Sequence, residues 1–202
     1  MRIILVRHGD TKSNSRERFW GATDVELNEE GVRQAHCLRD RLASEKLSAV
    51  YCSDLQRACH TAEIIAAPHG LSAVTCTELR EINFGELEGL AFSEISHRYP
   101  EFTRTWAQRN PDLRYPGGDR LEDFTRCVLT FLGRLEKHTD SDTVLVVAHS
   151  GVLRTLLCRL LGTELARRWQ YRMELASLSI VETRDGEGVL LKLNDLCHLE
   201  NK

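Results

Sequence analysis

Short apolar segments recur along the chain, and each has the length of a β-strand. Residues 3–6 are four consecutive apolar residues, mostly β-branched. A run that is apolar throughout, instead of alternating, is typical of a strand buried on both faces. The segments expected to be strands are residues 3–6, 49–52, 73–76, 143–148, 177–181 and 189–193.

The segments between these strands carry apolar residues at helical spacing. The pattern is clear over residues 28–42, 55–65, 121–135 and 152–160, and weaker over 91–108. Asn28 is expected to cap the first helix, because its side chain can accept a hydrogen bond from a free backbone N–H. Ser53 and Asp54 are expected to cap the second.

Strands that alternate with helices predict an α/β fold. We expect a three-layer α/β/α sandwich with a mostly parallel central sheet. Residues 1–202 are expected to form a single domain, with a small helical lid inserted at about 83–118, a section that ends at Pro116-Gly117-Gly118.

Three of the predicted strands end in a polar cluster. Arg7-His8 follows the first strand, Ser53 to Arg57 the second, and His149-Ser150 the longest. Ligands of open α/β sheets bind at the carboxyl ends of the strands. If the three strands lie parallel and side by side, these clusters form one pocket with two arginines, two histidines and two helix N-termini.

Arg57 has two interpretations. It falls in the first turn of a predicted helix, where a cation opposes the helix dipole. It is either a surface arginine that extends into solvent, or it helps to hold an anion at the helix N-terminus.

The chemistry of this pocket suits a dianionic phosphate. A histidine can act as a covalent nucleophile, and arginines can stabilise the charge of a transferring phosphoryl group. The leaving alkoxide also needs a proton, which a nearby carboxylic acid can supply. The acid-rich segment 78–88 is the expected source, but the pattern does not choose among Glu78, Glu81, Glu86 and Glu88.

Composition narrows the class of partner. The formal net charge is −3, and no run of lysine or arginine indicates a nucleic-acid or membrane surface. No apolar stretch approaches the roughly 20 residues of a membrane span, and Arg7-His8 interrupts the N-terminal apolar run, which excludes a signal peptide. We expect a cytoplasmic protein that acts on a small phosphorylated metabolite.

The cysteines and histidines do not indicate a metal site. Seven cysteines contain no C-x-x-C, and eight histidines show no H-x-x-x-H spacing. The cysteines are therefore expected to be reduced and to act mainly as small apolar residues.

Four motifs together resemble the histidine phosphatase superfamily, the phosphoglycerate mutase-like group, and the resemblance covers almost the whole chain. Many members carry glutamate where this chain has Asp10, which affects the contacts expected beside His8 and not the nucleophile. The motifs are Leu5-Val6-Arg7-His8-Gly9-Asp10-Thr11 with Asn14, Ser53-Asp54-Leu55-Gln56-Arg57-Ala58, Glu81-Ile82-Asn83-Phe84-Gly85, and Val147-Ala148-His149-Ser150-Gly151.

The resemblance implies a role for each matching residue. His8 would form a phosphohistidine, and Glu81 would donate a proton and later activate water. The resemblance implies no metal and no other cofactor. The residues expected to contact the substrate are Arg7, Asn14, Gly21, Arg57, His149 and Ser150.

Within the family, the chain is more similar to hydrolases than to mutases. Cofactor-dependent mutases are longer and carry extra basic residues between the acid segment and the second histidine motif. Residues 84–89, 116–118 and 193–199 resemble bacterial α-ribazole phosphatases most. The alternatives are a phosphoserine or broad-specificity phosphatase, then a phosphoglycerate mutase, then an inactive phosphate-binding protein. The oligomeric state stays open, with a homodimer as the candidate assembly.

Overall fold

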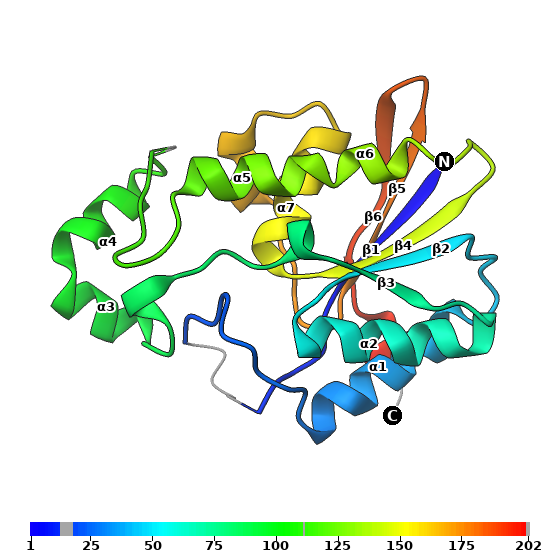
Figure 1. Cartoon of the computed structure of the whole chain (residues 1–202), viewed down its shortest axis with the longest axis horizontal. Coiled ribbons are helices and arrows are strands. Elements are labelled where there is room, and N and C mark those ends of the chain that lie inside the picture. Colours follow the sequence, from blue (N-terminus) through cyan, green and yellow to red (C-terminus); the bar gives the residue numbers. More distant parts are fainter. Residues whose placement is uncertain (13–17, 111, 201–202) are drawn as a thin grey trace.

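The computed structural model describes residues 1–12, 18–110 and 112–200 (Figure 1). Within them one sheet of six strands has the order β3-β2-β4-β1-β5-β6. The first four strands of this order are mutually parallel, β5 is antiparallel to β1, and β6 is antiparallel to β5, which confirms the mostly parallel sheet. The strands are β1 (Arg2–Arg7), β2 (Ala49–Ser53), β3 (Ala73–Cys76), β4 (Thr143–Ala148), β5 (Leu178–Arg184) and β6 (Glu187–Asp195).

The register of the central strands aligns their carboxyl ends. β1 pairs with β4 from Arg2↔Thr143 to Arg7↔Ala148. β4 pairs on its other side with β2, where Cys52 lies opposite Val147. The residues that follow these three strands therefore emerge at the same edge of the sheet, as the sequence predicts.

Helices cover both faces of the sheet and complete the three-layer sandwich (Figure 1). Alternate residues of β1 belong to different hydrophobic cores: Ile3 and Leu5 pack on one face, and Ile4 and Val6 on the other. The first core includes side chains of α5 and α7, and the second includes side chains of α1 and α2. The α-helices are α1 (Glu29–Leu42), α2 (Gln56–Ala66), α3 (Phe92–Arg98), α4 (Pro100–Ala107), α5 (Leu121–Thr130), α6 (Leu132–Leu135) and α7 (Ser150–Leu160).

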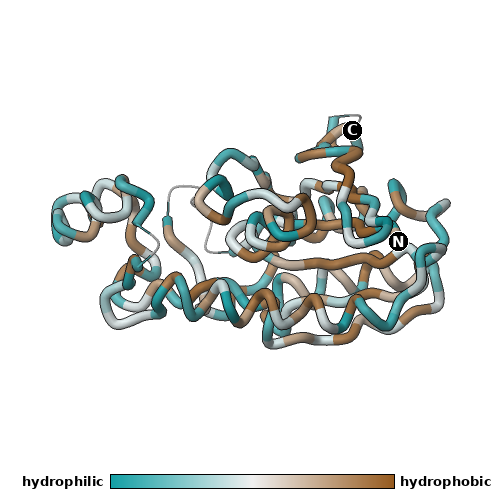
Figure 2. Tube along the Cα trace, turned by 90° about the horizontal axis from the view of Figure 1, so that it is seen from above, coloured by the Kyte–Doolittle hydropathy of each residue, from teal (hydrophilic) through white to brown (hydrophobic). Residues whose placement is uncertain are grey.

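Hydrophobic residues follow the strands through the interior, whereas hydrophilic residues predominate at the outer turns (Figure 2). Among the described residues, no helix is long and apolar enough to cross a membrane. Five short 3₁₀ helices complete the described secondary structure, and they are Ala67–His69, Thr77–Leu79, Gly85–Leu87, Leu165–Gln170 and Cys197–Leu199.

The start of α2 differs from the prediction. Its N-cap is Leu55, and neither Ser53 nor Asp54 caps the helix. The hydroxyl of Ser53 accepts a hydrogen bond from the Leu55 N–H and shapes the turn before the helix. The first helical N–H, that of Gln56, donates instead to the carboxylate of Asp24, 2.8 Å away. A distant residue therefore replaces the local cap. By contrast, the expected capping of α1 by Asn28 is confirmed.

The helix predicted over 121–135 is divided into α5 and α6. The hydroxyl of Thr130 donates to the carbonyl of Cys127, and the Phe131 N–H donates to Val128 three residues earlier. The turn at Phe131 thus separates the two helices.

Residues 83–118 contain α3 and α4, which project beyond one end of the sheet (Figure 1). The two helices are separated at Tyr99, whose φ of −129° and ψ of 60° are not helical. Pro100 causes this break, because proline disfavours the α region for the residue before it and suits the first turn of a new helix. That this segment closes over the site as a lid stays a prediction.

Candidate active site

Two histidines meet at the carboxyl edge of the sheet. His8 follows β1 directly and His149 follows β4, so the pairing of these strands places both rings side by side. Their centroids are 5.0 Å apart, with an interplanar angle of 59°. His8 is 6% exposed and His149 is 1% exposed.

Hydrogen bonds fix the tautomer of each ring. Nδ1 of His8 lies 2.7 Å from the carbonyl oxygen of Gly9. A carbonyl can only accept, so Nδ1 carries the proton and Nε2 keeps its lone pair. In His149, Nδ1 accepts from Nε of Arg57 at 3.3 Å. The proton of a neutral His149 is therefore on Nε2, which is buried and has no partner among the described residues.

The two histidines are held neutral. Burial lowers the pKa of His8 well below its usual value, and the nearby charges of Arg57 and Arg7 lower it further. The pKa of His149 is lowered in the same way, by burial first and then by Arg57. The pair therefore offers one lone pair, on His8, and one unpartnered N–H, on His149.

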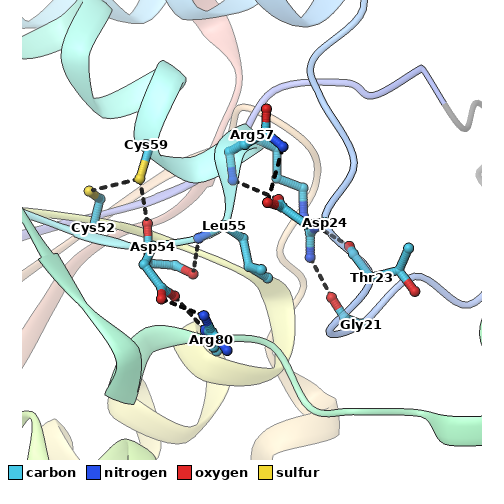
Figure 3. Close-up of polar contacts among 11 residues, drawn as sticks. Gly21, Thr23, Asp24, Cys52, Asp54, Leu55, Arg57, Cys59 and Arg80 are labelled. Atoms are coloured by element: carbon cyan, nitrogen blue, oxygen red, sulfur yellow. Dashed lines mark hydrogen bonds and ion pairs between the residues drawn. The ribbon is translucent and has the colours of Figure 1, made fainter.

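Arg57 is buried, with 1% of its surface exposed, so the interpretation as a surface arginine is wrong. Its Nη1 and Nη2 donate to the carbonyls of Thr23 and Gly21 at 2.8 and 2.6 Å (Figure 3). Burial lowers its pKa, and the charge of Glu81 partly offsets that effect. Arg57 thus connects the 21–24 loop to His149.

Arg7 and Arg154 bring two further cations to the site. Arg7 ends β1 and donates to the carbonyl of Met173 at 2.7 Å, while its buried Nε has no partner among the described residues. Burial lowers its pKa to about 10. Arg154 lies on α7, where its Nε donates to the carbonyl of Tyr171 and its guanidinium lies 5.7 Å from the ring centre of Trp169. Its position in an otherwise apolar stretch of α7 was a signal that the sequence analysis did not use.

Glu81 approaches the N-terminus of α7. Its Oε2 accepts from the Gly151 N–H at 2.9 Å, and its Oε1 accepts from its neighbour Ile82 at 3.1 Å. An added Cβ at Gly151 would lie 2.4 Å from Oε1. Glycine at this position therefore permits the carboxylate to reach the helix end, which is also where a negative charge is favoured.

The other three acids of segment 78–88 have partners elsewhere. Glu78 accepts from Arg134 at 2.8 Å, and Glu86 accepts from the hydroxyl of Tyr99. Glu88 accepts from the backbone N–H groups of Gly21, Ala22 and Phe84. Of the four acids, Glu81 alone lines the cavity beside the two histidines.

The structure gathers most of the predicted site residues in one cavity of about 370 Å³, whose polar end is lined by Arg7, His8, Glu81, His149, Ser150 and Arg154. Arg57 does not line this cavity and contacts His149, which does. Gly21 lies outside it as well, since its N–H binds Glu88 and its carbonyl binds Arg57. Asn14 lies outside the described residues.

The side chain of Asp10, where many family members carry glutamate, bonds to the protein backbone. Its Oδ1 accepts from the Thr11 N–H at 2.8 Å, and its own N–H donates to Gln34. It is buried, and the backbone of Gly31 approaches its carbonyl oxygen closely. Asp10 thus stabilises the loop that follows His8.

The model of the histidine phosphatase superfamily, branch 1, matches residues 3–196. The chain belongs to this superfamily. The match covers the sheet and every described residue of the candidate site, so the resemblance noted from the four motifs is confirmed.

The relatives of this histidine phosphatase include named phosphatases. Phosphoserine phosphatase 1 of Hydrogenobacter thermophilus is 34% identical over 98% of this chain and 94% of that protein. Adenosylcobalamin/alpha-ribazole phosphatase of Salmonella typhimurium is 32% identical over 96% of both. The crystal structure of the alpha-ribazole phosphatase from Shigella flexneri superposes with a TM-score of 0.88 at 28% identity, over 96% of each chain. The chain is therefore a phosphoric monoester hydrolase.

The residues at the site do not resemble a metal centre. Among the described residues, no group of three or more His, Cys, Asp or Glu side chains is placed to hold a metal ion. The two histidines are flanked instead by Arg7 and Arg57, whose charges lower the histidine pKa values.

All seven cysteines are free thiols, and four of them, Cys37, Cys52, Cys76 and Cys158, are buried.

Proposed function

We propose that this enzyme hydrolyses the phosphate monoester of a small metabolite through a phosphohistidine on His8, without a metal ion. The observation that carries the proposal is the pair of tautomers. Nε2 of His8 keeps a lone pair because Nδ1 donates to Gly9, while Nε2 of His149 carries an unpartnered proton. One ring is arranged to attack a phosphorus atom and the other to donate to a phosphoryl oxygen.

The surrounding charges support a phosphoryl group as the ligand. Arg7 and Arg154 line the cavity, and Arg57 stands directly behind His149. Cations and N–H donors of this kind stabilise the charge on the equatorial oxygens during phosphoryl transfer. They also repel a divalent metal ion, which is why we assign the charge stabilisation to the protein.

In the first step Nε2 of His8 attacks phosphorus, forming a P–N bond as the P–O bond of the ester breaks. The departing alkoxide takes a proton from the carboxyl group of Glu81 and leaves as an alcohol. Each Glu81 oxygen accepts one backbone N–H, so each keeps a lone pair on which that proton can reside.

In the second step water attacks the phosphohistidine. The Glu81 carboxylate accepts a proton from the water while the P–N bond breaks, and inorganic phosphate leaves with His8 regenerated. The two steps use the same carboxyl group first as acid and then as base, so one residue serves both half-reactions.

We propose α-ribazole 5′-phosphate as the first candidate substrate and phosphoserine as the second. The relatives named for these two activities cover this chain almost completely and at similar identity. Full-length similarity of this kind supports both candidates.

The proposal is tested by phosphate release in EDTA from α-ribazole 5′-phosphate, phosphoserine, 3-phosphoglycerate and p-nitrophenyl phosphate. We expect turnover by the parent enzyme and none by His8→Ala, together with an acid-labile phosphoenzyme in the parent only. Turnover by His8→Ala at the parent's rate would contradict the mechanism. Transfer to 3-phosphoglycerate that requires 2,3-bisphosphoglycerate would point to a mutase.

A further inference from the structure

The cavity beyond the catalytic groups has an aromatic lining. Seven Phe, Tyr and Trp side chains line it, among them all three tryptophans of the chain, Trp20, Trp106 and Trp169. The three indoles are only half-buried, although a large apolar ring gains most when it is fully covered. Part of each ring is therefore available to a molecule in the cavity.

The rings come from distant parts of the chain and form two connected groups. In the first group Phe84 lies 5.1 Å from the ring of Phe19 and 5.1 Å from that of Tyr115. In the second, Trp106 of α4 meets Trp169 edge to face at 5.8 Å, and a hydrogen bond between the side chains of Tyr115 and Trp106 joins the two groups. Arg154 holds the second group in place, because its guanidinium lies over the ring of Trp169 while its Nε donates to the backbone carbonyl of Tyr171.

The charges of the lining disfavour a cationic alcohol. Four arginines reach the cavity, whereas Glu81 is the one acid among the described residues that line it. The α-ammonium group of phosphoserine would meet arginines here, and the one acid of the described lining is the proposed proton donor.

We propose that the alcohol part of the natural substrate carries a flat aromatic ring, neutral or anionic, which packs against the aromatic lining of the cavity at Trp106 and Trp169. This inference rests on the proposed function and specifies its substrate class: a phosphate monoester of a nucleoside-like or aryl-bearing alcohol. Phosphoserine and phosphoglycerate fall outside this class.

A matched set of esters tests the inference. Ribose 5-phosphate, adenosine 5′-monophosphate, uridine 5′-monophosphate and α-ribazole 5′-phosphate all release the same kind of primary alcohol, so their chemical step is alike and they differ in the ring. We expect kcat/KM for at least one ring-bearing ester to exceed that for ribose 5-phosphate by tenfold or more, the scale of one aromatic stacking contact. The difference should lie mainly in KM.

Substitutions at Trp106 test whether the preference for ring-bearing esters depends on this side chain. Trp106→Ala should bring the ratio between the ring-bearing ester and ribose 5-phosphate close to one, whereas Trp106→Phe should preserve most of it. Leu191→Ala, which removes an exposed apolar side chain of β6 outside the cavity, serves as the control. The comparison of esters on the parent enzyme stands even if Trp106→Ala folds poorly.

The outcomes separate this inference from the proposed function. If ribose 5-phosphate is hydrolysed and every ring-bearing ester falls below the tenfold margin, the phosphatase mechanism stands and the aromatic site is refuted. A preference for phosphoserine refutes it equally. If no ester is hydrolysed and no phosphohistidine forms, the proposed function itself fails.

Discussion

Gly151 contributes to the site because the absence of a side chain leaves room for the carboxyl group of Glu81. Its N–H donates to Glu81, and an ideal Cβ would lie 2.4 Å from the Glu81 Oε1 and 3.2 Å from its Cδ. The carboxyl group is the far end of a buried side chain, and it must move if a methyl group is added. The position of the proposed proton donor thus depends on a glycine in the neighbouring helix.

We predict that Gly151→Ala lowers kcat/KM about 100-fold, the cost of displacing a catalytic group by roughly 1 Å. The loss should be greater for alkyl phosphates than for p-nitrophenyl phosphate, whose leaving group needs no proton. Glu81→Gln should show the same selectivity. Steady-state kinetics on both esters checks this.

Gly133→Ala is the matched control, because an added Cβ at Gly133 meets nothing within 4 Å, and it should behave as the parent. Equal losses on both esters in Gly151→Ala would indicate that the substitution damages more than the proton donor.

The neutral histidines predict how stability depends on pH. The pKa values of His8 and His149 are lowered in the folded state, whereas unfolded histidines titrate near 6.5. Below that pH the unfolded chain binds protons that the folded chain does not, so the free energy of unfolding falls as the pH falls. Each histidine contributes at most about 1.4 kcal/mol per pH unit.

Thermal unfolding between pH 7.5 and 5 checks this prediction. The double variant His8→Asn with His149→Asn should lose less stability over this range than the parent, because it lacks both groups. Inorganic phosphate should protect the parent and not the double variant. Identical pH profiles for the two proteins would show that the histidines bind protons equally in both states.

At the scale of elements, the 21–24 loop and the N-terminus of α2 support each other. Asp24 accepts from the backbone and side-chain nitrogens of Gln56 at 2.8 and 3.1 Å. The carbonyls of Gly21 and Thr23 accept hydrogen bonds from the guanidinium of Arg57, one residue further along the helix. A cap and a buried cation therefore hold one loop at two points.

We predict that Asp24→Ala destabilises the protein by about 1 kcal/mol, the usual cost of losing a cap, and lowers kcat/KM through the displaced loop. Asp54→Ala is the control: it removes the two hydrogen bonds to Arg80 near the same helix end (Figure 3) but leaves those of Asp24 in place. Denaturant unfolding and kinetics on both variants check it. A larger loss of activity in Asp54→Ala would contradict the role given to Asp24.

The strands and most helices could be predicted because their signals are local. β1 and β4 are continuous apolar runs, which indicate burial on both faces wherever they pair. The start of α2 is an exception, because it depends on a contact that spans the chain. Asp24 lies 32 residues from the N–H that it caps.

The candidate site divides in the same way. His8, His149 and Arg7 are at the ends of strands, where the parallel topology brings them together. The sequence pattern did not distinguish among the four acids in segment 78–88 as the proton donor. Only the fold shows that three of them bind elsewhere. The contact between Trp106 and Trp169 could not be predicted, because aromatic residues at helical spacing are also typical of an ordinary hydrophobic core.

For the molecule as a whole, net charge and local charge have opposite signs. The chain carries a formal charge of −3, yet four arginines and one described acid line the cavity. We predict that kcat/KM for a dianionic ester falls as ionic strength rises from 10 to 300 mM, because salt screens the local attraction. Neutral viscogens at constant salt control for diffusion, and a rise of kcat/KM with salt would mean that the overall negative charge dominates.

The place of β1 in the sheet has a consequence for synthesis of the protein. The strand made first lies between β4 and β5, so its two neighbours begin 141 and 176 residues after it, at Thr143 and Leu178. At 5–20 residues per second, a ribosome needs roughly 7 to 30 seconds to supply the first of them. Throughout that interval the apolar strand β1 lacks both of its neighbours in the sheet. The proposed nucleophile His8 therefore meets His149 only after a further 141 residues have been made.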